Sequence, residues 1–147
     1  MEHTELAGTL RELLSSQMLA ALATQSEGQP YNCLVAIAAT EDLKHLLFST
    51  LRHTRKYREI KADSRVSILV DSRSNRESDF RDAMAVTATG RAVEADGSEK
   101  ERLLGVYLAR HPHLTDFAGS PGSALVRIDV EEYILSSFRE VSKLSLD

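Results

Sequence analysis

The sequence has few of the residues that covalent cross-links or metal cages require. Cys33 is the single cysteine among 147 residues, so no disulfide can form within the chain and no cysteine-based metal site can be built. No run approaches the ~18 consecutive apolar residues of a membrane helix, and the acidic residues 1–5 do not resemble a signal peptide. We therefore expect a cytoplasmic protein with no membrane contact and no resident metal.

The chain also lacks an excess of positively charged residues. The net charge of -4 does not favour nucleic acid as a partner. The chain contains no Walker loop, no Gly-rich dinucleotide fingerprint and no Ser-His-Asp order. We can therefore name no catalytic residue from sequence motifs. At this length, with 42% hydrophobic residues, we expect one domain over residues 1–147.

Hydrophobic periodicity predicts three short helices. Apolar residues recur at helical spacing in Leu6, Leu10, Leu13 and Leu14, and Thr4 stands in position to cap that helix. A second helix is predicted over residues 53–62. A third is predicted to begin at Ser98, where residues 98–101 match a capping box, and to end at His111.

Strands are predicted to make up most of the remaining chain. Alternating and apolar runs indicate strands at residues 18–24, 31–39, 45–49, 66–71, 83–94, 124–138 and 141–146, with residues 72–82 as a loop. Gly90, inside the longest alternating run, predicts a bulge or a close approach of another backbone. Most strands are joined by tight turns, so we expect a mainly β fold with short helices, arranged as an antiparallel barrel.

The segment 48–56 places hydroxyls and cations at the start of a predicted helix. Free amides and the helix dipole attract an anion at that end. Arg55 could make a two-pronged bond to phosphate and Lys56 could add a point charge. Further hydroxyl donors are available from Ser49, Thr50 and Thr54. The alternative is that the cations of residues 52–58 form a solvated helix face.

The same segment resembles the FMN-phosphate segment of the pyridoxamine-phosphate-oxidase-like split barrels. In that family a strand end is followed by Ser-Arg-Lys, a helix and an Arg-Val-Ser strand, and residues 54–56 and 65–67 match the two triplets. The resemblance implies an FMN-binding split β-barrel in one domain. It implies that the flavin phosphate or ribityl chain is held by Ser49, Thr50, Thr54, Arg55 and Lys56, and that Val35 and Ala36 lie beside the isoalloxazine.

The resemblance further implies a homodimer with flavin at the subunit interface, acting as an FMN-dependent oxidoreductase on an unknown small molecule. The family's oxidase binds the vitamin phosphate with an Arg and a His near its carboxyl end. Residues 136–147 hold no such pair, so we do not expect turnover of pyridoxamine phosphate.

Alternative functions stay open at this point. They are a non-catalytic flavin carrier, a deazaflavin-using enzyme, and a haem-binding or haem-degrading split barrel that uses His111 or His113. Arg73 and Arg76 lie in a charged loop, which is either a solvated turn or a lid over the partner subunit's flavin.

Overall fold

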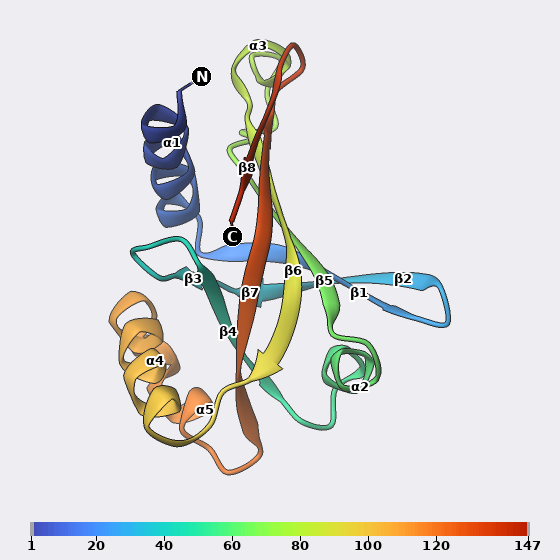
Figure 1. Cartoon of the computed structure of the whole chain (residues 1–147), viewed down its shortest axis with the longest axis vertical. Helices are drawn as coiled ribbons and strands as arrows, with labels where there is room; N and C mark the ends of the chain where they lie inside the picture. Colours follow the sequence, from blue (N-terminus) through green and yellow to red (C-terminus); the bar gives the residue numbers. More distant parts are fainter. Residues whose placement is uncertain (1, 147) are drawn as a thin grey trace.

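The computed structural model describes residues 2–146 and consists mainly of one antiparallel sheet (Figure 1). Its strands are β1 (Leu19–Ser26), β2 (Gln29–Ala36), β3 (Ala38–Ala39), β4 (His45–Leu51), β5 (Arg65–Asp71), β6 (Ala85–Glu94), β7 (Ser123–Ser136) and β8 (Val141–Ser145). Neighbouring strands follow the order β2-β1-β5-β6-β7-β4-β3, and β8 pairs with β7. The sheet curls into a half-barrel, which confirms the predicted mainly β split barrel.

The helices within residues 2–146 are short and lie around this sheet. They are α1 (His3–Ser16), α2 (Arg55–Ala62), α3 (Asp79–Asp82), α4 (Gly97–Arg110) and α5 (Thr115–Ala118), with a 3-10 turn, η1 (Pro112–Leu114), before α5. None of them has the length and apolar character needed to cross a membrane. Helix α3 falls in the segment predicted as a loop. Periodicity could not reveal it, because four residues span barely one helical turn.

Both predicted helix caps are wrong. Thr4 lies inside α1, whose N-cap is Glu2 without a side-chain hydrogen bond. Helix α4 begins at Gly97, and its N-cap residue makes no side-chain hydrogen bond either, so residues 98–101 do not form the capping box. Glu99 pairs instead with Arg127 of β7. A capping box needs its serine at the N-cap position, and Ser98 lies inside the helix because the N-cap is Asp96.

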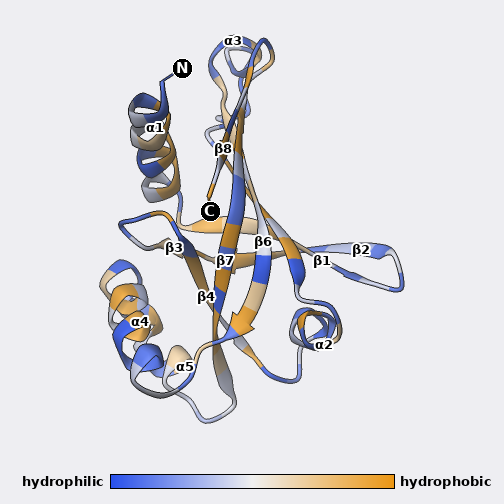
Figure 2. Ribbon diagram, viewed as in Figure 1, coloured by the Kyte–Doolittle hydropathy of each residue, from blue (hydrophilic) through white to orange (hydrophobic). Residues whose placement is uncertain are grey.

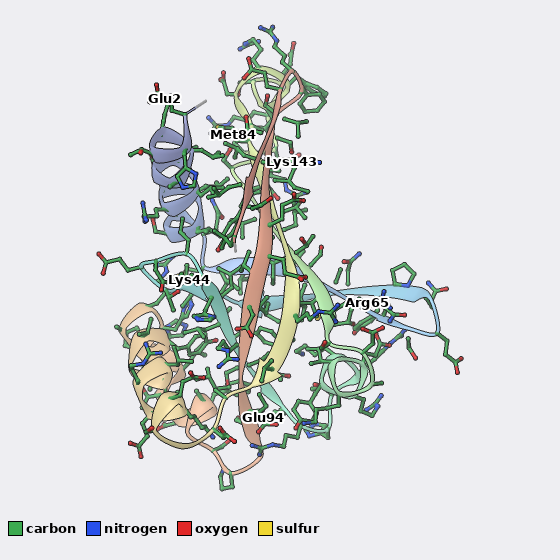
Figure 3. The ribbon with its side chains drawn as sticks, viewed as in Figure 1. Glu2, Lys44, Arg65, Met84, Glu94 and Lys143 are labelled. Carbon is green, nitrogen blue, oxygen red and sulfur yellow. The ribbon has the colours of Figure 1, made fainter. Side chains whose placement is uncertain are left out.

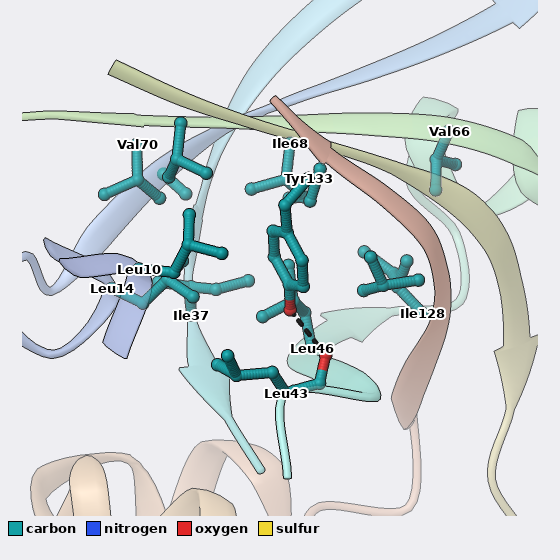
Figure 4. Close-up of a cluster of buried hydrophobic side chains, with 14 of the residues drawn as sticks. Leu10, Leu14, Ile37, Leu43, Leu46, Val66, Ile68, Val70, Ile128 and Tyr133 are labelled. Carbon is teal, nitrogen blue, oxygen red and sulfur yellow. Dashed lines mark hydrogen bonds between the residues drawn. The ribbon is translucent and has the colours of Figure 1, made fainter. Parts of the chain in front are cut away.

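The core lies on the concave side of the sheet, under α1. The predicted leucine stripe of α1 and the alternating residues Val66, Ile68 and Val70 of β5 are all buried there. Figure 2 shows the hydrophobic colouring concentrated on the strands, while α2 is largely hydrophilic. In the core itself (Figure 4), the Tyr133 hydroxyl donates to the Leu43 carbonyl at 2.7 Å, so the one polar group of that ring is satisfied.

The predicted irregularity at Gly90 is confirmed. The pairing of β6 with β7 shifts register between Thr89 and Gly90, which places two residues of β7 opposite one of β6. A Cβ atom on Gly90 would lie 2.1 Å from the carbonyl oxygen of Asp129. Only glycine fits at this point, because the partner backbone occupies the space that a side chain needs.

Candidate functional site

A cleft of about 320 Å³ opens where the lower end of β4 passes between α2 and the α4–α5 segment (Figure 1). That volume falls within the range of roughly 300–1,000 Å³ found for small-molecule sites. The cleft is lined by Leu34, Val35, Ala36, Ser49, Thr50, Leu51, Thr54, Lys56, Tyr107, Leu114 and Phe117. Segments far apart in the sequence therefore meet at this point.

The structure brings nearly all of the predicted cofactor residues to this cleft. Its lining includes Val35, Ala36, Ser49, Thr50, Thr54 and Lys56. Arg55 is the exception. Its guanidinium lies 4.0 Å from the centre of the Tyr31 ring, and its Nε donates to Glu59 at 2.9 Å. Contact of any of these residues with a cofactor stays a prediction.

Hydroxyl groups form one corner of the cleft. Ser49 is 7% exposed, and its Oγ is buried with no hydrogen-bond partner among the described residues. Thr50 and Thr54 share a hydrogen bond of 3.1 Å. Thr54 is also the N-cap of α2, because its hydroxyl accepts from the Tyr57 amide. Buried polar atoms are nearly always bonded, so the Ser49 oxygen is an exception within the described part of the chain.

The cations of residues 52–58 differ in what they contact. Arg52 donates to the Pro121 carbonyl at 2.9 Å and to Glu94 at 2.8 Å, at the end of β6 (Figure 3). Arg58 donates to a backbone carbonyl just before α2. For Lys56 the described residues supply no hydrogen-bond acceptor or ion partner, and this side chain lines the cleft. Lys56 is therefore the cation of this segment that is available to an anionic ligand.

The opposite wall of the cleft comes from residues that the sequence did not reveal as site residues. Tyr107 of α4 is buried, and its hydroxyl donates to the Ala36 carbonyl at 3.0 Å. Burial raises the pKa of the Tyr107 hydroxyl, which keeps it protonated as a donor. Leu114 and Phe117 add an apolar surface. Tyr107 lies within the helix that the sequence predicted after Ser98, but no local signal shows which cleft this side chain borders.

The lining of the cleft offers little acid–base chemistry of its own. The lining residues, all within the described part of the chain, include no carboxylate, imidazole or thiol, and Lys56 is their only charged member. Catalysis by a side-chain acid or base of this chain would need such a group within hydrogen-bond reach of the reacting atoms. Redox chemistry at this site would therefore depend on a bound cofactor.

The histidines considered as haem or metal ligands lie elsewhere. His111 is fully buried, and its Nε2 lies 2.7 Å from the Ile37 carbonyl. A carbonyl can only accept, so this nitrogen carries the proton and ties the end of α4 to the sheet. His113 is exposed. Among residues 2–146, no group of three or more His, Cys, Asp or Glu side chains is placed to hold a metal ion.

The charged loop after β5 is also separate from the cleft within one chain. Arg73 makes an exposed ion pair with Asp71 at 2.9 Å, and neither Arg73 nor Arg76 lines the cleft. The interpretation of this loop as a lid over the partner subunit's flavin stays a prediction.

The fold is that of a split barrel, and the cleft beside β4 is its candidate small-molecule site. A model of the family described as pyridoxamine 5'-phosphate oxidase matches residues 6–137, so the chain belongs to this family. The comparison with curated proteins found no match.

Solved structures support the fold. A heme binding protein from Mycobacterium smegmatis is similar at a TM-score of 0.84 and 17% identity, over 95% of this chain and 57% of that one. ChuZ from Campylobacter jejuni gives a TM-score of 0.82 at 11% identity, over 99% of this chain and 61% of that one. The chain thus spans about three fifths of the length of these two proteins. A FAD-binding protein from Mesorhizobium loti gives a TM-score of 0.67 at 21% identity, over 93% and 90% of the two chains.

Proposed function

We propose that the chain binds FMN in the cleft and acts as an FMN-dependent oxidoreductase. The observation that carries the proposal is the lining of the cleft. One end of the cleft holds polar groups that lack a hydrogen-bond or ion partner, and an apolar wall lies beside them. Ser49 of β4, whose buried oxygen lacks a partner, and the unpaired Lys56 line the same cleft, and Lys56 lies in the first turn of α2, where backbone amides also lack acceptors within the helix. A phosphate would satisfy all of these groups at once.

The remaining lining suits a flat, weakly polar ring. Val35 and Ala36 line one side, and Leu114 and Phe117 lie on the α4–α5 side, where they would exclude water. FMN, when bound, would supply the electron transfer that no side chain of the cleft provides. The protein's part is binding and orientation of the cofactor. Membership of the pyridoxamine 5'-phosphate oxidase family supports a flavin.

Titration with FMN and riboflavin tests the phosphate site. Riboflavin lacks the phosphate, so it loses the charge-assisted contact to Lys56. Such contacts contribute about 1.5–3 kcal/mol, so FMN should bind roughly ten- to a hundredfold more tightly. Quenching of flavin fluorescence measures both affinities. Equal affinity for the two flavins would contradict the proposed phosphate site.

Haem is the second candidate ligand, because one protein of closely similar fold is described as a heme binding protein. Addition of haemin to the purified chain, followed by its Soret absorbance, separates this candidate from flavin binding. FAD belongs in the same flavin titration, since the Mesorhizobium loti protein is described as FAD-binding. Oxidation of NADPH by the FMN-loaded protein would distinguish the oxidoreductase from a non-catalytic flavin carrier.

We also propose a homodimer that forms through the convex side of the sheet. A row of directly opposed residues crosses five strands there before it meets Lys143 on β8, and it consists of Leu34, Ala21, Leu69, Thr87 and Ile134. None is charged, and Leu34 is 67% exposed. The outer face of an antiparallel sheet normally carries polar residues, so an uncharged row supports a covered face. Leu34 also lines the cleft, which supports a cofactor site at the subunit boundary.

Replacing Leu34 with arginine should therefore shift the protein from dimer to monomer. The substitution places a charge in the proposed apolar contact, where burial without a partner is costly. Light scattering should show the mass of two 16.3 kDa chains for the wild type and of one for the variant. Val93→Arg is the matched control, because Val93 is also exposed but pairs with Arg127, outside the row. A wild-type mass of one chain would refute the dimer.

A further inference from the structure

We infer that Glu59 is a positioning residue for the cofactor site, which holds the first turn of α2 so that Lys56 lies in the cleft. The inference rests on the proposed FMN site and adds a residue that does not line the cleft. Lys56 follows Arg55 directly in α2, and Arg55 is bonded to Glu59 one turn further along. A contact that fixes this turn of the helix against the sheet, such as the hydrogen bond from Thr24 to Glu59, therefore also sets the direction in which Lys56 leaves the helix.

Glu59 is a buried carboxylate with two defined donors. It is 7% exposed. Its Oε2 accepts from Arg55 Nε at 2.9 Å, and its Oε1 accepts from the Thr24 hydroxyl of β1 at 2.7 Å. The hydrogen bond from Arg55, followed by that from Thr24, lowers the pKa of Glu59. The carboxylate is thus ionised at neutral pH, and it links α2 to the sheet.

The contacts of Glu59 belong to a closed cluster, here called the α2 clamp, made of Thr24, Tyr31, Arg55 and Glu59. Thr24 and Tyr31 are direct partners across the β1–β2 hairpin. Arg55 lies over the Tyr31 ring, and Glu59 accepts from Thr24. Both strands of the hairpin therefore contact the same helical turn. Ser49 and Thr50 of the cleft lie on β4, which the Thr50–Thr54 hydrogen bond links to the start of α2. The clamp adds a second link, from α2 to β1 and β2, and so helps to set where Lys56 lies relative to these hydroxyls.

Two accounts of Glu59 predict opposite changes in FMN affinity when this residue is removed. The carboxylate compensates the Arg55 guanidinium, so its loss would leave a more positive site. If only charge mattered, FMN would then bind more tightly to a Glu59→Leu variant. A positioning role predicts weaker FMN binding, because the first turn of α2 loses its link to β1. The sign of the change therefore separates the two accounts.

Thr24→Val is the cleaner substitution, since it removes the hydroxyl donor and leaves every charge in place. We expect FMN affinity to fall about three- to tenfold, which is the effect of losing one hydrogen bond. Riboflavin affinity should change less than about twofold, which is within the usual error of such comparisons. Thr24→Ser restores the donor and should restore FMN affinity. In a Lys56→Met background the Thr24→Val change should have no further effect, because the clamp acts through Lys56.

The experiment measures the affinities of the wild type and of the Thr24→Val, Thr24→Ser and Glu59→Leu variants for FMN and for riboflavin. The thermal stability of each of these four proteins is measured in the absence of flavin. An equal loss of affinity for both flavins, or a gain for FMN in Glu59→Leu, would overturn the positioning role. Unchanged FMN affinity in Thr24→Val, with a wild type that prefers FMN, would also overturn it and leave the proposed function intact. A wild type without preference for FMN would refute the proposed function itself.

Discussion

Replacing Gly90 with alanine should destabilise the protein by roughly 3 kcal/mol or more, since a rigid overlap cannot relax as a side chain can. The added Cβ would lie 2.1 Å from the Asp129 carbonyl oxygen and 3.0 Å from the Cα of Val130. Both atoms belong to the backbone of β7. Relief of the overlap would require β6 and β7 to separate at the bulge, where the two longest strands of the sheet pair.

Urea denaturation of the wild type and the Gly90→Ala variant measures this effect. Gly105→Ala is the matched control, because Gly105 lies inside α4 and its Cβ would meet nothing within 4 Å. That substitution should instead stabilise the protein by about 0.5–1 kcal/mol, through the better helix propensity of alanine. A Gly90→Ala midpoint equal to that of the wild type would show that β7 can move away from the bulge at little cost.

Replacing Lys56 with methionine should weaken FMN binding by about ten- to a hundredfold, which corresponds to the 1.5–3 kcal/mol of a charge-assisted contact. Methionine keeps most of the apolar stem and removes only the charged donor. Riboflavin affinity should stay near the wild-type value. Thermal stability without flavin should also be preserved, because the described residues give the Lys56 side chain no acceptor to lose.

Lys61→Met is the control for Lys56→Met on the same helix. Lys61 lies in the last turn of α2, with its Nζ 5.7 Å from the centre of the Tyr57 ring, and it does not line the cleft. Its loss should leave FMN affinity unchanged. Equal weakening by both substitutions would mean that the general charge of α2, and not a placed contact, attracts the cofactor. Arg55→Ala is expected to weaken FMN as well, but through the α2 clamp.

The local patterns of the sequence predicted most of the sheet and much of the site. Alternation in β5 and the leucine stripe of α1 report which side of an element is apolar, and this depends only on the residues of that element. The pattern behind the proposed anion site in residues 49–56 is local in the same way, because a strand end, a hydroxyl cap and a helix start lie within eight positions. Gly90 could also be identified from the sequence, because a glycine within a strand usually marks a bulge or the close approach of another backbone.

Other features of the site depend on contacts between distant segments. Tyr107 and Phe117 line the cleft because α4 and α5 fold back against β4. His111, at the end of α4, donates a hydrogen bond to the Ile37 carbonyl. The spacing of residues along the chain does not predict which distant segments come into contact.

By itself, the sequence determined the class of fold and the segment that carries the proposed anion site, because both follow from patterns within single elements. The tertiary structure decided which of two adjacent cations lines the cleft. Arg55 is bonded to Glu59 and lies over Tyr31, whereas Lys56 is left without a partner in the described chain. That choice depends on Thr24 and Tyr31, more than twenty residues away, which contact α2 only once the β1–β2 hairpin has packed against it.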